Sequence, residues 1–550
     1  KGQYLGLLPT LLRYSVASLG ACRADGAPDA LAPEGGVALE EDPDLALGLA
    51  FVAALRPPPP PPQQAEEESL EFVDGTFALL AAVVSVASGT AALTDCGIVP
   101  ALSGLIAQEI EDGATPAGSS ELSGMLREYV TAQAIAILEQ ATVVNTAAFA
   151  AFNDAGGLDL LASRLCREVE RCRTMWEQDR TTSTDGAGAA PPAPRALGPT
   201  RGVLCSLVNC ITVVLQQQGA STAGGGGAQL QKPELTAAVL YVLAHVREFG
   251  ILVPLVLALL ADVMNNEPQV VPYVHTSGLA GGFLDLLWQL AGDADPPAAT
   301  CSHDLIMVLP NVLGALSLHA TGAGVVLAAN PFPALLDLFL HPALVMPRSR
   351  CLHGDCPSIF GTSFDELMRH HPNLKARCIT ALVAACGKLV AVGRSLVAAE
   401  EEALRSRDDT ALAALEERRT CFIQYVCNIA QLLEQVVSRA EHASLFLAAG
   451  GAAQLLAHFP LLVPPGRQFL AHCSCLSNPG VTHLAHFPAA NAVAATVKTL
   501  AQFESIKLLG TLKKGVTAAL EELAATQATL RHAAAGSAAP PPGGTDTAAR

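Results

Sequence analysis

A short unit of apolar segment, turn and second apolar segment recurs along the chain. It reads LTDCGIVPALSGLI from Leu93, FNDAGGLDLLASRL from Phe152, VHTSGLAGGFLDLLWQL from Val274, VLAANPFPALLDLFL from Val326 and LFLAAGGAAQLLAHF from Leu445. In each case a small or turn-forming residue separates two segments whose Leu and Phe residues lie three or four positions apart, as on one face of a helix. The pattern predicts pairs of helices joined by tight turns.

Glycines mark four of these turns, at Gly97, Gly156, Gly278 and Gly450. Glycine adopts the left-handed backbone conformation that ends a helix, and it also allows two helices to approach closely. The spacing of the four glycines is irregular, so the repeat is degenerate and interrupted by insertions. Repeats of about 40 to 47 residues in the armadillo or HEAT class suit the pattern once the insertions are discounted.

Longer helices are predicted between the turns. Phe422, Val426, Ile429, Leu433 and Val436 follow one another at steps of three or four, and similar stripes begin near Leu122 and Leu158. None of these helices buries its apolar stripe without a neighbour. The predicted fold class is therefore all-α, an armadillo/HEAT-like α-solenoid with low-complexity loop insertions.

Proline, glycine and acidic runs divide the chain. The segment from Ser221 to Pro233 is expected to be a flexible loop within a helical region. The expected organisation is a helical repeat region at 1–55, a Pro/acidic linker at 56–69, repeats at 70–180, a disordered insertion at 181–200, repeats at 201–345, a loop at 346–363, repeats at 364–535 and a low-complexity tail at 536–550.

Composition narrows the class of protein. Of the 550 residues 51% are hydrophobic, 15% are charged and 5% are aromatic, which favours closely packed helices. The net charge of −18, without a Lys/Arg-rich run, disfavours direct nucleic-acid binding. Fifteen scattered cysteines and no secretory signal predict a cytoplasmic or nuclear location. Because the chain begins with Lys1, we expect it to be part of a longer protein.

The high apolar content also raises a membrane alternative. The least charged window runs from Leu305 to Leu336 and is long enough to span a bilayer. It contains Pro310, Asn311 and Pro333, which break or polarise a spanning helix. The segments Gly250 to Met264 and Gly75 to Leu93 are too short or too polar. No membrane partner is predicted.

One stretch, CLHGDCPSIFGTSFDELMRHHPNLK from Cys351 to Lys375, concentrates polar chemistry. Cys351, His353 and Cys356, with a fourth ligand from the two histidines at 370 and 371, offer a zinc alternative, but their spacing matches no standard zinc motif. We instead expect a solvent-facing loop followed by a helix junction.

In that junction Ser363 would cap a helix whose first turn holds Asp365 and Glu366, with Leu367 and Met368 facing the core. The helix would end at Pro372, and a second would begin near Asn373. A possible partner surface is predicted at Asp365, Glu366, Arg369, His370 and His371.

Other candidate chemistry is weaker. The HCSC run from His472 to Cys475, with His483 and His486, is a second zinc alternative. GTLKKGVT from Gly510 has glycines spaced as in a phosphate loop but carries Val516 where that motif needs lysine. We therefore predict no catalytic residue, no cofactor and no metal site.

A specific resemblance rests on LPNVLGALSLHATGAGVVLAANPFPALLDLFLHPAL (Leu309 to Leu344) and FDELMRHHPNLKARCITALV (Phe364 to Val383). These segments resemble the N-terminal armadillo-like region of the giant HECT-type E3 ubiquitin-protein ligases of animals, yeast and plants. The similarity extends, more loosely, from about Gly2 to about Leu520.

The resemblance implies a non-catalytic solenoid segment that recruits substrates for ubiquitination and proteasomal degradation. Ubiquitin and the E2 would be bound only by a HECT domain outside this segment, so whether the parent protein is an enzyme is not decided by these residues. The partners would be protein substrates, and the acidic charge favours basic ones. The alternative is a free-standing armadillo-type adaptor without enzymatic activity.

Overall fold

A computed structural model describes residues 62–107, 121–183, 200–218, 225–293, 303–341, 356–462 and 486–537. These residues form helices and connecting turns and contain no β-strand. The all-α prediction is confirmed. The chain divides into two compact units, unit 1 being Lys1–Leu286 with Ala315–Gly324 and unit 2 being Leu287–Gly314 with Val325–Arg550.

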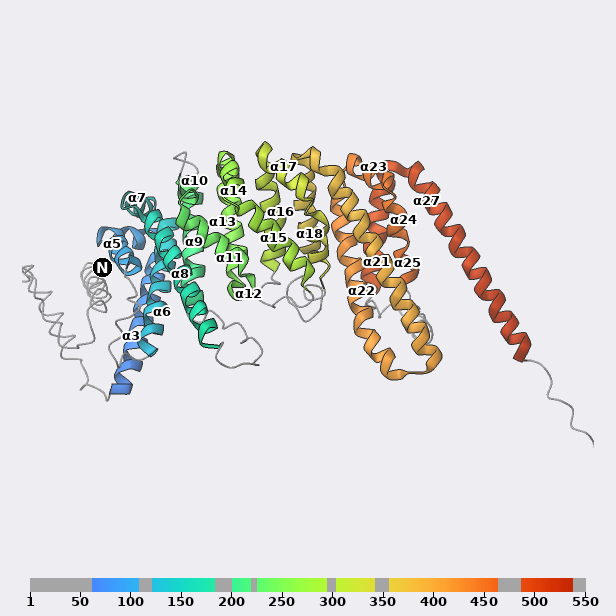
Figure 1. The fold of residues 1–550 in the computed structure, drawn as a ribbon, viewed down its shortest axis with the longest axis horizontal. Coiled ribbons are helices and arrows are strands. Elements are labelled where there is room, and N and C mark those ends of the chain that lie inside the picture. Colours follow the sequence, from blue (N-terminus) through green and yellow to red (C-terminus); the bar gives the residue numbers. More distant parts are fainter. Residues whose placement is uncertain are drawn as a thin grey trace, which may run out of the picture. The chain divides into compact units, whose positions relative to one another are not determined.

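Unit 1 contains the helices of the first half of the chain. In order these are α3 (Pro62–Val84), α4 (Ala87–Asp95), α5 (Ile98–Ala107), α6 (Glu121–Val144), α7 (Thr146–Asp154), α8 (Gly157–Ser183), α9 (Thr200–Gln218), α10 (Gly225–Leu230), α11 (Pro233–Ala244), α12 (Val246–Phe249), α13 (Leu252–Asn266), η2 (Pro268–Val270) and α14 (Val271–Thr276). Within the unit α3 packs on α6, α6 on α9, α9 on α13 and α8 on α11 (Figure 1).

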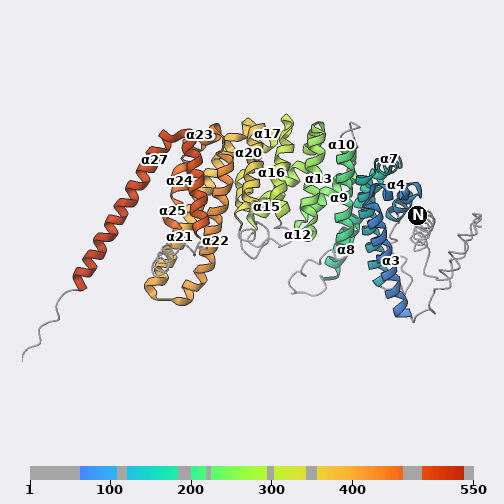
Figure 2. The ribbon, with the colours of Figure 1, turned by 180° about the vertical axis from the view of Figure 1, so that it is seen from behind.

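Three helices contribute residues to both units: α15 (Leu279–Gly292), α16 (His303–Ser317) and α17 (Ala320–Ala329). Unit 2 further contains α18 (Phe332–Phe339), α20 (Cys356–His370), α21 (Pro372–Ser406), α22 (Asp409–Val436), α23 (Ala440–Ala448), α24 (Gly451–Leu456), α25 (His458–Leu461) and α27 (His486–Ser537). Here α20 packs on α22, α21 on α18 and α22, and α22 on α27 (Figure 2). In each unit a helix mainly contacts elements near it in the sequence, as an α-solenoid requires.

The predicted turns have the backbone that the glycines suggested. Gly97, Gly156, Gly278 and Gly450 have φ angles of 83°, 72°, 88° and 82°, and Asn330 serves the fifth turn with a φ of 47°. Each lies between a short helix (α4, α7, α14, α23 or α17) and the next helix of its pair. A positive φ is unfavourable for residues with a Cβ, and asparagine tolerates it better than most. The turn prediction is confirmed at all five positions.

The FxxxGG segments of α7–α8 and α23–α24 use their second glycine differently. A Cβ added at Gly157 would lie 2.3 Å from the ring of Phe152, and one at Gly451 would lie 2.4 Å from the ring of Phe446. Both rings are fully buried. In each pair the first glycine supplies the left-handed turn and the second makes room for the phenylalanine that closes it.

Several predicted boundaries change. Helix α3 begins at Pro62, so the acidic part of the predicted linker is helical; α8 continues to Ser183; and α27 continues to Ser537. The expected loop from Ser221 to Pro233 is wrong over α10, because Glu267 Oε1 accepts the backbone N–H groups of Gly226 and Gly227 at 3.0 and 3.1 Å. Residues 1–55 lie outside the described part of the chain.

Helix α21 was not among the membrane candidates predicted from the sequence. Among the described residues α21 is long and apolar enough to cross a membrane, and up to four spans result if each of three bent helix pairs is counted as one. In unit 2 the apolar face of α21 packs on α18, α22, α23, α24 and α25. Its Lys388 forms an ion pair of 2.7 Å with Asp337. The structure therefore uses this apolar face for helix packing.

Candidate partner surface and the polar network beneath it

The predicted partner surface lies on α20, which begins earlier than expected. Phe360, Phe364 and Met368 are fully buried at steps of four residues, and Cys356 extends the same stripe by one turn. The predicted loop at 346–363 is therefore wrong from Cys356 onward, and Ser363 is an interior helical residue, not a cap. Stacking of Phe360 on Phe339 of α18, with centroids 4.7 Å apart, helps explain why this punctuated sequence is helical.

Helix α20 makes a close backbone contact with α22. A Cβ added at Gly361 would lie 2.6 Å from the carbonyl oxygen of Leu432 and 3.0 Å from its Cα. Only glycine permits this approach. The contact brings the C-terminal half of α20 beside the turn between α22 and α23.

Asp365 is buried at that turn and is not part of the surface. Asp365 is only 7% exposed. Its carboxylate accepts a hydrogen bond of 2.7 Å from Arg439 Nε and lies 2.9 Å from Nδ1 of His442. His442, which is 1% exposed, also lies 3.3 Å from the carbonyl oxygen of Val436. Asp365 therefore ties α20 to the start of α23.

The other predicted residues have different environments. Glu366 and Arg369 form an exposed ion pair of 3.5 Å, and His370 is exposed beside them on the same helical face. His371 lies between α20 and α21 and is partly buried, and burial together with the neighbouring His370 lowers its pKa. Helix α21 begins at Pro372, next to the predicted start. The partner surface stays a prediction for Glu366, Arg369 and His370.

The metal alternatives gain no supporting geometry from the described residues. Cys356 is buried, with its Sγ 3.8 Å from Met307 Sδ, and the part of the chain that the structure describes contains no group of three His, Cys, Asp or Glu residues able to hold a metal. Cys351, His353 and the HCSC run with His483 lie outside the described residues. The GTLKKGVT segment lies inside α27, so it forms no phosphate-binding loop.

Several cysteine thiols are poorly suited to act as nucleophiles. Burial raises the pKa of Cys386 and of Cys172 to about 12 and that of Cys166 to about 11. A thiol with so high a pKa is protonated near neutral pH and is a weak nucleophile. Cys172 and Cys386 are core residues of the helical packing, and Cys166 is partly buried.

Two buried ion pairs were missed by sequence reasoning. In unit 2 Arg419 Nε donates to Glu400 Oε1 at 2.8 Å and Arg419 Nη1 donates to the Leu461 carbonyl at 2.6 Å. In unit 1 Arg164 pairs with Glu168 at 2.7 Å and donates to the Ile106 carbonyl at 3.1 Å. Both arginines sit in charged runs that look like solvated helix faces, so residue type alone could not identify them.

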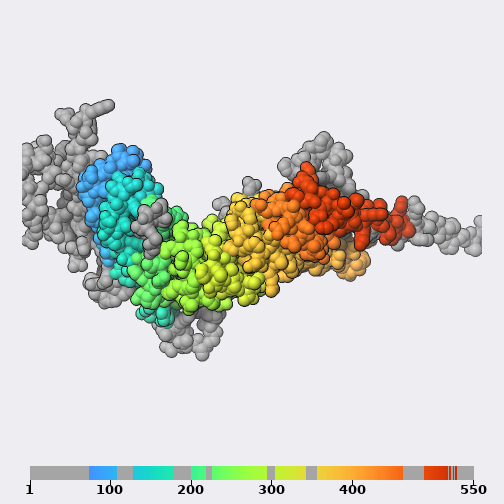
Figure 3. All heavy atoms as spheres, turned by 90° about the horizontal axis from the view of Figure 1, so that it is seen from above, coloured from blue at the N-terminus to red at the C-terminus, as the bar shows by residue number. Residues whose placement is uncertain are grey.

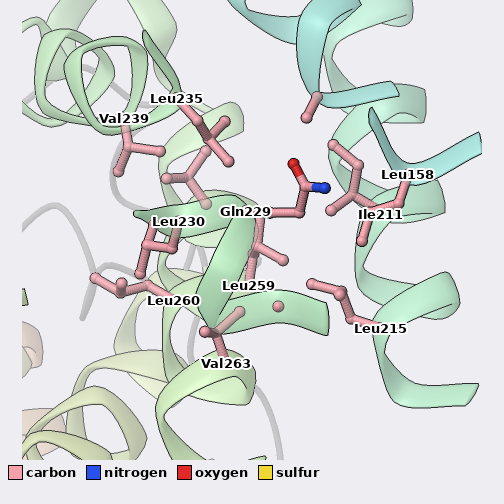
Figure 4. A pocket seen from close by; sticks show the side chains of 13 residues that line it. Leu158, Ile211, Leu215, Gln229, Leu230, Leu235, Val239, Leu259, Leu260 and Val263 are labelled. Carbon is pink, nitrogen blue, oxygen red and sulfur yellow. The ribbon is translucent and has the colours of Figure 1, made fainter. Parts of the chain in front are cut away.

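A cavity in unit 1 lies between α8, α9, α10, α11 and α13. Its volume is about 20 Å³, and its lining is almost entirely Leu, Ile and Val, with Gln229 as the polar exception (Figure 4). Binding pockets for small molecules are on the order of 300 to 1,000 Å³. This cavity is a packing defect of the core and not a substrate site.

The buried His458 predicts a pH dependence of stability. Its side chain is fully buried on α25, and this burial lowers its pKa below 6.5. Below about pH 6.5 the unfolded chain binds a proton that the folded state does not, so the free energy of unfolding falls as the pH drops. We expect His458→Leu to weaken this fall between about pH 7 and 5 in urea unfolding.

The exposed His275 provides the matched control for His458. His275→Gln should leave the pH dependence as it is in the wild type. An unchanged pH dependence in His458→Leu would contradict the assignment.

The described helices pack serially, with polar side-chain contacts between neighbouring helices. Residues 132–405 match the family described as Domain of Unknown Function (DUF913). Over these residues, just under half of its length, the chain is similar to this family. It is 24% identical to E3 ubiquitin-protein ligase UPL1 of Arabidopsis thaliana, over 72% of this chain and 11% of the relative.

Two further relatives carry the same description. E3 ubiquitin-protein ligase HUWE1 of Mus musculus is 25% identical over 62% of this chain and 8% of its own length. E3 ubiquitin-protein ligase TOM1 of Saccharomyces cerevisiae is 32% identical over 24% of this chain and 4% of its own length. The resemblance to the N-terminal region of the giant E3 ubiquitin-protein ligases is confirmed. The chain spans about a tenth or less of the length of these relatives.

Proposed function

We propose that this chain is a non-catalytic scaffold segment of a HECT-type E3 ubiquitin-protein ligase and that it presents helical surfaces to substrates. The similarity to E3 ligases over 72% of the chain carries the proposal. Serial packing supports it, because stacked helices without a closed core offer an extended surface for protein partners. The transfer of ubiquitin belongs to a HECT domain elsewhere in the parent protein, which acts in the cytoplasm or nucleus.

Glu366, Arg369 and His370 form the first candidate contact surface, and the net charge of −18 favours basic partners. The test measures binding of core histones, as a basic probe, to the 550-residue chain by interferometry. Replacing Glu366 by alanine should weaken binding by about tenfold, because a well-placed charged contact with a basic partner is worth about 1.4 kcal/mol or more.

The matched control is alanine replacement of Glu170 on α8 in unit 1, an exposed carboxylate that pairs with Arg173 three residues on, as Glu366 does with Arg369. This control should bind histones as the wild type does. Equal losses in both variants would indicate general electrostatic attraction and would contradict a specific surface on α20.

The ligase assignment itself is tested by reading the transcript beyond the codon for Arg550. A continuous frame that encodes a HECT domain supports the scaffold role. A frame that stops within a few dozen codons would refute it and favour the free-standing adaptor.

A further inference from the structure

Helix α27 has two parts with different surroundings. Before Glu504 its Ala489, Val493 and Leu500 are fully buried, and the helix packs on α22, α23 and α24. The Thr496 hydroxyl donates to the Ala430 carbonyl at 2.8 Å. Glu504 then leaves helical geometry, with φ −135° and ψ 51°, and the chain changes direction. The C-terminal part projects away from α22–α25 in the ribbon and space-filling views (Figures 1 and 3).

The projecting part carries an exposed apolar face. Ile506 is 87% exposed, Leu509 64%, Val516 57% and Leu520 60%. Together with Lys513, these residues are separated by alternating steps of three and four. This spacing places side chains along one side of a helix, as in helices that pack in pairs. Leu508, at 1% exposure, is the last fully buried residue after the kink, so the exposed stripe begins where the packed part of α27 ends. An apolar stripe of this extent on a single helix indicates a contact site.

The charge around the stripe identifies the kind of partner. Between Glu504 and Glu521 the only charged residues are Lys507, Lys513 and Lys514, in a chain whose net charge is −18. Lys507 pairs with Glu504 at 3.0 Å, so the charge beside the stripe comes from Lys513 and Lys514, and two copies of this helix centred on the same turns would bring those two lysines of each copy together. A partner helix with carboxylates beside its own apolar stripe would instead pack its apolar side chains on the stripe of α27 and place its carboxylates beside the lysine ammonium groups.

We propose that the segment from Ile506 to Leu520 is a docking site for an acidic amphipathic helix of a partner protein. The partner helix lies along the stripe, with its leucines against Leu509 and Val516 and its carboxylates beside Lys513 and Lys514. This proposal does not depend on the ligase assignment, because it rests on the exposure and charge of α27 alone.

The test titrates the 550-residue chain into a fluorescein-labelled three-heptad peptide with leucine at the core positions and glutamate at the flanking positions. A second peptide has lysine in place of glutamate. We expect the glutamate peptide to bind at least about tenfold more tightly than the lysine peptide, with an affinity that falls as salt is added. The double substitution Ile506→Glu and Leu509→Glu should weaken binding of the glutamate peptide by at least about tenfold.

Val143→Glu provides the control, because Val143 on α6 is 58% exposed and lies far from α27 in the sequence. All variants replace exposed side chains, so their unfolding midpoints should match the wild type and report intact folding. Equal binding of both peptides, or binding that survives the double substitution, would overturn the proposal. The proposal would also be overturned if the chain dimerises in light scattering and the double substitution abolishes the dimer. The same holds if the chain binds anionic vesicles but not the peptides, and the double substitution abolishes vesicle binding. Those outcomes would assign the stripe to a second copy or to a lipid surface.

Discussion

Arg419→Met is expected to lower the free energy of unfolding of unit 2 by about 3 to 5 kcal/mol, because it leaves Glu400 buried without its partner. Both residues are 7% exposed. Arg419 joins α22 to α21 through Glu400 and to the end of α25 through the Leu461 carbonyl, so its removal also leaves that carbonyl without this donor. Urea unfolding followed by circular dichroism measures the loss.

The double variant Arg419→Met and Glu400→Leu removes both charges. It should recover most of the lost stability, because a buried ion pair replaced by apolar residues of similar size is often close to neutral. Arg405→Met breaks the exposed pair with Glu402 one turn from the end of α21 and should change stability by less than about 1 kcal/mol. A loss in Arg419→Met as small as that in Arg405→Met would contradict the buried clamp.

Gly361→Val is expected to lower the free energy of unfolding by about 3 kcal/mol, near the upper end of typical overpacking effects. The added carbons meet the backbone of Leu432, which has no flexible end to move aside. This steric overlap is relieved only if α20 moves away from α22, and that movement would also lengthen the contacts of Asp365 with Arg439 and His442. The same unfolding assay measures the effect, and hydrogen exchange of α23 should rise with it.

Gly387 on α21 is the matched glycine. A Cβ there would meet nothing closer than 3.7 Å, so Gly387→Ala should raise stability by about 0.5 to 1 kcal/mol through helix propensity. Destabilisation in both variants would show that any substitution of a helical glycine harms this unit. Gly361 would then have no special role.

The helical turns were predictable because their signals are local. A glycine between two apolar segments at helical spacing identifies the turns at Gly97, Gly156, Gly278 and Gly450, since backbone conformation depends mainly on the residue itself. The stripe of α22 from Phe422 to Val436 was equally visible and is fully buried at the predicted positions. The start of α20 was missed because Cys356, Pro357 and Gly361 look like loop residues, although Phe360, Phe364 and Met368 already had helical spacing.

The candidate site was only partly accessible from sequence. The stretch around Asp365 was identified as polar and helical. Nothing in the sequence, however, shows which of the adjacent carboxylates, Asp365 or Glu366, is buried. Their positions on the helix turn one inward and the other outward. Likewise Glu400 and Arg419 belong to charged runs in which the neighbouring Glu401, Glu402 and Arg418 are exposed.

By itself, then, the sequence determined the all-α class, the glycine turns, the long apolar stripes and the resemblance to E3 ubiquitin-protein ligases, because each depends on residues close together in the chain. Tertiary structure alone decided that Asp365 is buried against His442 and that the backbone of α22 lies close to Gly361. It also decided that Arg419 pairs with Glu400 and that Ile506 is exposed. Each of those facts depends on which helix face meets which neighbour. That outcome is set by contacts between segments distant in sequence, and no local pattern encodes it.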